Sequence, residues 1–167
     1  MKKNSELKLE VGDLVVYPIY GVGEIENFDT YNVDGSKQDF ILINFKQDKM
    51  KLRIPKKKAA NSGLRKLSNK NRLSKALEVL AEDPSIKKDM WIKRAKEYEK
   101  NINSGDPVLI AEVVRDLHKK QDSLEQQSYS ERQIYLTALN RLSNEYAAVQ
   151  NLEKKAAKVK LEQLLNQ

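Results

Sequence analysis

The sequence predicts an α+β protein in which a small N-terminal β domain precedes a compact C-terminal domain of about five helices. Two observations support this fold class. Up to about residue 55 the apolar residues follow strand-like patterns, whereas from Leu73 onward they recur at helical spacing. Asn61-Ser62-Gly63 marks the change between the two patterns. We therefore expect one domain over residues 1–60 and a second over residues 61–167.

Four or five short strands are expected in the first domain. The stretch Val11–Pro18 is typical of a strand that ends at a proline, which cannot donate to a β ladder. Gly21-Val22-Gly23 predicts a tight turn into a second strand at residues 24–28. Asp34-Gly35 is a hairpin signal, and residues 39–45 are rich in the β-branched and aromatic residues that strands favour.

Residues 49–55 alternate between basic and apolar side chains, which is the period of a half-buried strand. The apolar members, expected to face a core, are Met50, Leu52 and Ile54. The basic members, expected to face outward, are Lys49, Lys51 and Arg53. Short strands following one another so closely predict a small, strongly bent barrel of the Tudor or SH3 type.

Helical spacing begins at Leu73 and ends at Asp83-Pro84. A second helix is expected over residues 88–102, with Trp91 on its apolar stripe and Gly105 as its C-terminal stop. This stripe also contains Ala95, Tyr98 and Ile102.

Three further helices are expected. Asp106 is a predicted N-cap, and Pro107 occupies the first helical position, where proline is tolerated. Ser130 and Gln133 have the spacing of a capping box for the fourth helix, and residues 152–165 form the last. The expected core residues of the third and fourth helices are Ile110, Val113, Val114, Leu117, Tyr135, Leu139, Leu142, Tyr146 and Val149.

The residue inventory offers little for catalysis. The chain has no cysteine, and its only histidine, His118, is expected to meet the carbonyls at the end of the third helix. Gly21-Val22-Gly23 lacks the third glycine of a dinucleotide loop, and the carboxylates are expected to be scattered over helix surfaces. We therefore predict a protein that is not an enzyme, with no metal, no cofactor and no small-molecule substrate.

The composition also bounds where the protein works. The 167 residues suffice for one ordinary domain or two small ones, and 33% of them are charged. No apolar run approaches the ~20 residues that span a bilayer, and residues 4–10 contain no apolar export signal. We expect a cytoplasmic protein that does not contact a membrane and acts as a monomer.

Residues 46–75, named here the basic segment, dominate the charge of the chain. Twelve basic residues against the single acid Asp48 give this segment +11, more than the +7 of the whole chain. Such a segment favours a polyanionic partner, of which nucleic acid is the commonest. We therefore interpret this segment as a basic hinge between the two domains; the alternative is a solvated, lysine-rich linker.

Several motifs together resemble one known family. Residues 10–18 followed by Gly21-Val22-Gly23, the strand Leu52–Pro55, and residues 104–117 resemble, in order and spacing, the CarD/CdnL family of bacterial transcription regulators. The resemblance covers almost the full chain. It implies a Tudor-like N-terminal module that binds the β subunit of RNA polymerase through a strand edge. It also implies a helical domain that contacts promoter DNA at the upstream edge of the transcription bubble.

The resemblance assigns roles to individual residues. Arg53 matches the polymerase-contacting arginine, Lys51 lies on the same strand, and Tyr31 occupies a position where some members have a second arginine. Trp91 matches the family's DNA-contacting tryptophan wedge. The neighbouring basic residues expected to contact DNA are Lys88, Lys93, Arg94 and Lys96. The chain departs from the family at Ile92, usually a small polar residue, and at Ala95, often an aromatic one.

Two alternatives accompany this interpretation. The stripe that Trp91 shares with Tyr98 is also typical of a helix core, so Trp91 is either a buried core residue or an exposed DNA wedge. The function expected from the resemblance is a regulator that stabilises the promoter open complex. The alternative function is a free-standing, non-specific DNA- or RNA-binding protein.

Overall fold

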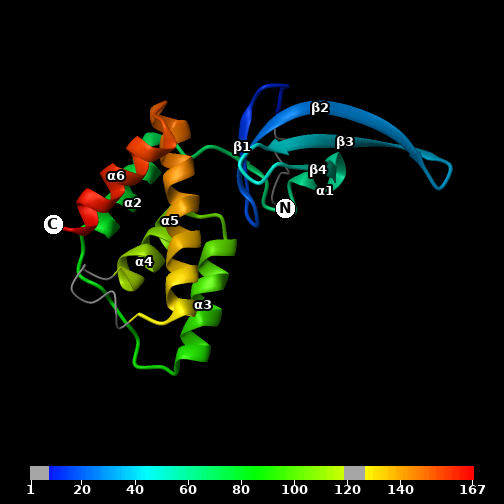
Figure 1. Ribbon diagram of the computed structural model, residues 1–167. Coiled ribbons are helices and arrows are strands. Elements are labelled where there is room, and N and C mark those ends of the chain that lie inside the picture. The colour runs from blue at the N-terminus through cyan, green and yellow to red at the C-terminus, as the bar shows by residue number, and fades with distance from the viewer. Residues whose placement is uncertain (1–7, 119–126) are drawn as a thin grey trace. The chain divides into compact units, whose positions relative to one another are not determined.

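The computed structural model describes residues 8–118 and 127–167. The chain divides into two compact units, Met1–Leu67 and Ser68–Gln167 (Figure 1). The sequence suggested a boundary after residue 60. The first unit extends further because Leu64 is buried in its core and the strand Arg65–Lys66 completes its sheet.

The N-terminal unit is a five-stranded antiparallel sheet in the order β4-β3-β2-β1-β5. Its strands are β1 (Leu14–Tyr17), β2 (Gly21–Val33), β3 (Ser36–Phe45), β4 (Met50–Pro55) and β5 (Arg65–Lys66). One short helix, α1 (Lys56–Ala59), follows β4. The long ribbon formed by β2 and β3 curves away from the rest of the unit (Figure 1). This is the small Tudor/SH3-like β domain that the strand pattern predicts.

The turn between β1 and β2 lies earlier than predicted. Gly21, Val22 and Gly23 belong to β2 and pair with β1, while the turn is closed by Tyr20 N–H donating to Tyr17 C=O at 3.1 Å. Gly23 is required for close packing instead. A Cβ there would lie 2.6 Å from Ile43 Cγ2 and 2.8 Å from Phe45 Cε1, so any side chain would collide with the core.

The hairpin between β2 and β3 forms where it was predicted. Asp34 and Gly35 both have positive φ angles, 51° and 82°, as a type I′ turn requires. The strands that flank this turn are longer than expected, because β2 continues to Val33 and pairs residue by residue with β3. The register shifts once, by a β-bulge between Ile25 and Asn27.

The basic segment is largely folded, which corrects the interpretation of a linker or hinge. It contains β4, α1, β5 and the first half of α2 (Lys70–Leu80). In β4 the predicted alternation is confirmed, with Ile54 buried, Met50 and Leu52 packed against the core, and the basic residues exposed. Part of the basic charge is therefore displayed on a rigid sheet.

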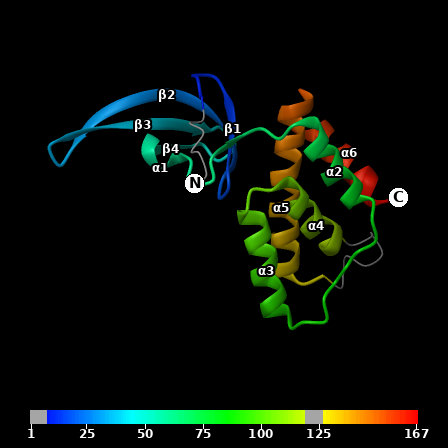
Figure 2. The ribbon, with the colours of Figure 1, turned by 180° about the vertical axis from the view of Figure 1, so that it is seen from behind.

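The described residues of the C-terminal unit, 68–118 and 127–167, form the five helices expected. They are α2, α3 (Trp91–Asn103), α4 (Pro107–Leu117), α5 (Tyr129–Gln150) and α6 (Lys154–Leu165). The apolar helix α4 lies at the centre, and α2 and α6 lie side by side in both views (Figures 1 and 2). No helix in the described parts of the chain is long and apolar enough to cross a membrane.

Helix boundaries follow the local signals with two differences. Asp106 caps α4 as predicted, accepting from Val108 N–H at 2.9 Å, and Gly105 follows the end of α3 with φ of 73°. Helix α3 begins at Trp91, so Lys88 lies in the preceding loop. Helix α5 is capped by Ser128, which accepts from Glu131 N–H at 3.2 Å, rather than by Ser130. Both serines have a Glu or Gln three positions later, and only the folded context distinguishes them.

Three side chains in the helical unit differ from the sequence-based expectations. His118 does not bind helix carbonyls through its ring; Nδ1 and Nε2 each lie 3.0 Å from a side-chain oxygen, of Tyr135 and Asn166 respectively. Asp116 and Glu145 are buried rather than scattered on the surface. Asp116 accepts hydrogen bonds from Ser85 N–H and Arg115 Nε, both at 2.9 Å. It therefore ties the loop after α2 to α4.

Candidate functional sites

Arg53 and Tyr31 lie together on the outward face of the sheet. The Arg53 guanidinium carbon is 5.3 Å from the centre of the Tyr31 ring, within the range of a cation–π contact. Arg53 Nε also donates to Asp29 Oδ2 at 3.3 Å. Both Arg53 and Tyr31 are exposed, and the centres of the Tyr31 and Phe40 rings lie 5.7 Å apart in an edge-to-face arrangement. Two residues assigned to one role by resemblance therefore form one cluster.

The cluster is positioned by strand register. Arg53 in β4 is opposite Leu42 in β3, and Asp29 in β2 is opposite Phe40 in β3. Residues opposite each other on neighbouring strands share a face, and so do alternate residues of one strand. Arg53, Asp29 and Tyr31 therefore all point away from the core. β4 is the last strand at one edge of the sheet, so its outer edge is not paired within the described sheet.

Acidic residues of β2 pair with the basic residues of this face, a feature that the sequence-based interpretation missed. Lys51 Nζ lies 2.8 Å from Glu26 Oε1, and Lys46 Nζ lies 2.6 Å from Glu24 Oε2. The hydrogen bond and the charge of Glu24 raise the pKa of Lys46. The face is thus a mixture of opposite charges, with Lys51 and Arg53 both held by carboxylates of β2. Strand alternation in the sequence could have predicted that these carboxylates face outward, but it could not have predicted which basic residues they pair with.

Trp91, the first residue of α3, is partly buried. It packs against the helical core, and the centre of its ring lies 6.3 Å from that of Tyr98, two turns later, at an interplanar angle of 49°. Trp91 is therefore neither a fully buried core residue nor a fully exposed side chain, which were the two alternatives predicted from the sequence. Trp91 is anchored on one side by its own helix and reaches solvent on the other.

Arg94 supports Trp91 rather than projecting into solvent. Its guanidinium carbon is 5.4 Å from the Trp91 ring and 6.0 Å from the Tyr98 ring. Arg94 Nε is buried and has no hydrogen-bond partner among the described residues. The side chain borders a polar cavity of about 230 Å³ whose wall also includes Glu97, Glu112 and Arg115. Arg94 thus helps to position the Trp91 ring through its cation–π contact.

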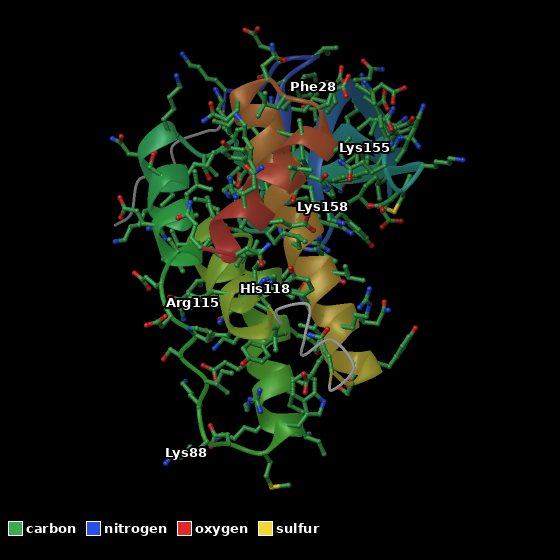
Figure 3. The ribbon with its side chains drawn as sticks, turned by 60° about the vertical axis from the view of Figure 1, so that its left-hand side comes forward. Phe28, Lys88, Arg115, His118, Lys155 and Lys158 are labelled. Carbon is green, nitrogen blue, oxygen red and sulfur yellow. The ribbon has the colours of Figure 1, made fainter. Side chains whose placement is uncertain are left out.

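The remaining basic residues of this region are exposed. Lys88 projects from the loop before α3 (Figure 3), and Lys96 is exposed on the helix. Lys93 Nζ lies 3.4 Å from Asp89 Oδ1, within one turn. Lys87, which was not assigned a role, pairs with Glu97 at 2.7 Å, and this hydrogen bond raises its pKa. Lys88, Lys93 and Lys96 are therefore exposed within five residues of Trp91 along the chain.

The described residues, 8–118 and 127–167, contain no group of three or more His, Asp or Glu side chains arranged to hold a metal ion. The two features of interest are instead surfaces. One is an exposed arginine–aromatic cluster beside a sheet edge, and the other is a partly buried tryptophan in contact with Arg94 and Tyr98. They are candidate surfaces for contact with macromolecules, one in each unit.

Comparison with known proteins identifies the family. Residues 9–68 match the model of the CarD-like/TRCF RID domain, and residues 75–162 match the model of the CarD C-terminal domain. The chain belongs to the CarD family of transcription regulators. The family resemblance inferred from the motifs is therefore confirmed.

Two relatives illustrate the relationship. The chain is 28% identical over 151 residues to "Putative transcription factor YdeB" of Bacillus subtilis strain 168, covering 89% of this chain and 97% of that protein. The solution NMR structure of the 72-residue N-terminal domain of Myxococcus xanthus CarD is 36% identical. That match covers 35% of this chain and 79% of the other, with a TM-score of 0.31.

Proposed function

We propose that this protein binds the β subunit of RNA polymerase through its N-terminal unit and stabilises the promoter open complex through its helical unit. The observation that carries the proposal is the exposed cluster of Arg53, Tyr31 and Asp29 beside the sheet-edge strand β4. It lies within the segment that matches the CarD-like/TRCF RID domain.

The polymerase contact would use strand addition. An unpaired edge offers backbone N–H and C=O groups that an extended strand of the partner can bind, while neighbouring side chains supply specificity. Tyr31 and Asp29 hold the Arg53 guanidinium in one region of the surface, which reduces the conformational entropy that binding must remove. Lys51, two residues earlier on β4, would contribute charge complementarity at the rim.

The DNA contact would use Trp91. An aromatic ring at the upstream edge of the melted region can stack on an exposed base, which is worth ~1–3 kcal/mol. Because ~1.4 kcal/mol changes an equilibrium tenfold, one such contact suffices to alter promoter opening measurably. Arg94 and Tyr98 would hold the ring in position, while Lys88, Lys93 and Lys96 would contact phosphates.

The lifetime of open complexes on a defined promoter, challenged with a competitor and followed with and without the full-length protein, tests the proposal. We expect the protein to extend this lifetime, and core RNA polymerase to retain the protein in a pull-down at moderate salt. If the protein is retained equally by any nucleic acid, in a salt-sensitive manner and without polymerase, the free-standing binding function replaces this one.

Trp91→Ala supplies the companion test. Because Trp91 is only partly buried, its truncation should cost about 1–3 kcal/mol, between the cost at a surface site and that at a core site. Polymerase retention should persist while the open-complex lifetime shortens. Thermal denaturation measures the first effect, and the lifetime assay the second. A stable Trp91→Ala protein with an unchanged lifetime would contradict the assignment of this residue.

A further inference from the structure

Two large apolar side chains flank Trp91 and are strongly exposed. Met90 is 76% exposed and Ile92 is 65% exposed, and among large apolar side chains of the described residues only Tyr129 is more exposed. Ile86, in the loop before α3, is 44% exposed. The start of α3 therefore presents two exposed apolar side chains, one on each side of the partly buried Trp91 in the sequence. Residues 90–92 are named here the Met90–Ile92 tip.

The Met90–Ile92 tip is not explained by helix formation. Met90 occupies the N-cap position of α3, and no side chain caps the helix there. Serine, asparagine or aspartate would satisfy a free N–H at this position, and methionine cannot. Ile92 points away from the stripe on which Tyr98 and Ile102 are buried. Met90 therefore does not stabilise the start of the helix, and neither Met90 nor Ile92 contributes to the core.

The surroundings of the Met90–Ile92 tip favour a polyanion. Residues 86–97 contain five cations and only two carboxylates, Asp89 and Glu97. A membrane fits less well, because helices that lie on a bilayer present an apolar face along their length, whereas the apolar stripe of α3 is buried against its own unit. Bases at a junction between duplex and melted DNA combine exposed apolar surface with flanking phosphates.

We propose that Met90 and Ile92 act with Trp91 as a three-residue wedge that contacts the bases at a junction between duplex and single-stranded DNA. This inference rests on the proposed function of the helical unit and specifies its DNA-contacting surface. Met and Ile are among the apolar side chains that insert between base steps. Trp91 is held by Arg94 and Tyr98, so the two flanking side chains supply the freely accessible part of the wedge.

The test uses the full-length protein and two DNA probes of equal length and salt conditions, one a blunt duplex and one a fork with 2-aminopurine at its junction. Wild-type protein should bind the fork more tightly and change the 2-aminopurine fluorescence. The double variant Met90→Ser, Ile92→Ser should lose roughly tenfold in fork preference, the scale of one stacking contact. Val159→Ser, which alters a 51%-exposed apolar residue on α6, is the matched control and should change nothing.

Met90→Asn separates a wedge role from a structural one. An asparagine N-cap should raise the melting temperature, because it can accept from a free N–H of the first turn. It should also lower fork preference, because the apolar side chain is lost. A raised melting temperature with unchanged fork preference would overturn the role of Met90, and equal binding of both probes by the wild type would overturn the whole inference.

The outcome also distinguishes this inference from the proposed function. If the wild type extends the open-complex lifetime and the double variant does so equally, the wedge is wrong and the function stands. If fork preference depends on Met90 and Ile92 but polymerase is neither bound nor affected, the wedge stands and the function is wrong. A third outcome would also overturn the wedge. In it, the wild type self-associates or binds anionic vesicles, and the double variant loses that binding but keeps the fork preference.

Discussion

Arg53 and Arg94 make the same kind of contact with opposite consequences. Each guanidinium lies over an aromatic ring, Tyr31 for Arg53 and Trp91 for Arg94. Arg53 is exposed, so its guanidinium N–H groups remain available to a partner. Arg94 is partly buried and positions the Trp91 ring. Exposure therefore decides which arginine is available to a partner and which one positions a neighbour.

Arg53→Glu should weaken binding of core RNA polymerase at least tenfold, because it reverses a charge and places two carboxylates together at Asp29. The fold should persist, since Arg53 faces away from the core formed with Ile54. Affinity can be measured by biolayer interferometry and folding by circular dichroism. Lys66→Glu, an exposed charge reversal on the opposite edge strand β5, is the control. Equal loss in both variants would indicate a general charge effect.

Tyr135 makes the stability of the helical unit sensitive to high pH. Burial, and then the charge of Glu162, raise the pKa of Tyr135 to about 12 from 10.0. Since the folded pKa is above the unfolded one, this contribution is fully present below about pH 10 and is lost as pH rises towards 12. Full linkage would give roughly 2.7 kcal/mol, which partial exposure of the ring reduces to about 1 kcal/mol.

Tyr135→Phe should therefore lose less stability than the wild type between pH 9.5 and about 11.5, in urea denaturation at matched ionic strength. Tyr129→Phe is the control, because Tyr129 is 79% exposed. Parallel stability curves for Tyr135→Phe and the wild type would show that another group, such as a lysine, causes the loss.

At the scale of elements, the sheet modifies the charge of the basic segment. The charge count alone predicts strong, salt-sensitive binding to any duplex. In the folded protein, however, Lys46, Lys51 and Arg53 pair with carboxylates of β2, and Arg72 pairs with Asp106 at the start of α4. The sheet thereby converts part of a uniform basic run into a patterned surface, which suits a protein partner better than bare phosphates.

Glu24→Gln combined with Glu26→Gln should release Lys46 and Lys51 and raise non-specific affinity for duplex DNA. The slope of log affinity against log salt should steepen by up to about 1.8, since each added phosphate contact contributes about 0.9. Fluorescence anisotropy over a salt series measures both effects. Glu78→Gln with Glu99→Gln removes the same charge from exposed sites on helices α2 and α3. If that control steepens the slope equally, net charge rather than pairing governs binding.

At the scale of the whole molecule, two units with separate cores carry separate surfaces. The β unit has its own core around Ile25, Ile43 and Phe45, and the helical unit has another around Ala111, Val113 and Leu139. Separate cores allow a substitution in one unit to leave the other folded. The proposed activity nevertheless requires both, because one surface would hold the polymerase while the other meets DNA.

The two surfaces should therefore respond differently to concentration. Arg53→Glu should lose its effect on open-complex lifetime at low protein concentration and regain part of it at high concentration, because only tethering is weakened. Trp91→Ala should reach saturation at the wild-type concentration with a lower plateau. Titration of each variant in the lifetime assay measures both quantities. Identical titration curves for the two variants would contradict a division of labour between the units.

Local signals in the sequence determined much of this architecture. The Asp34-Gly35 hairpin, the Asp106-Pro107 helix start and the inward side of β4 at Ile54 all form as predicted. Each depends on backbone sterics, capping or side-chain alternation within a few residues, so it can be inferred from a short stretch. The helix start at Ser128 was missed because Ser130 satisfies the same local rule.

Tertiary structure decided which side chains meet. The bulge between Ile25 and Asn27 inserts one residue into β2, so that Asp29 and Tyr31 share the outward face with Arg53. Without it, strict alternation from the buried Ile25 would turn both side chains towards the core. The sequence determined where strands and helices form, because those signals are local. The partners of Arg53 were decided by register between strands distant in sequence, which only the folded chain specifies.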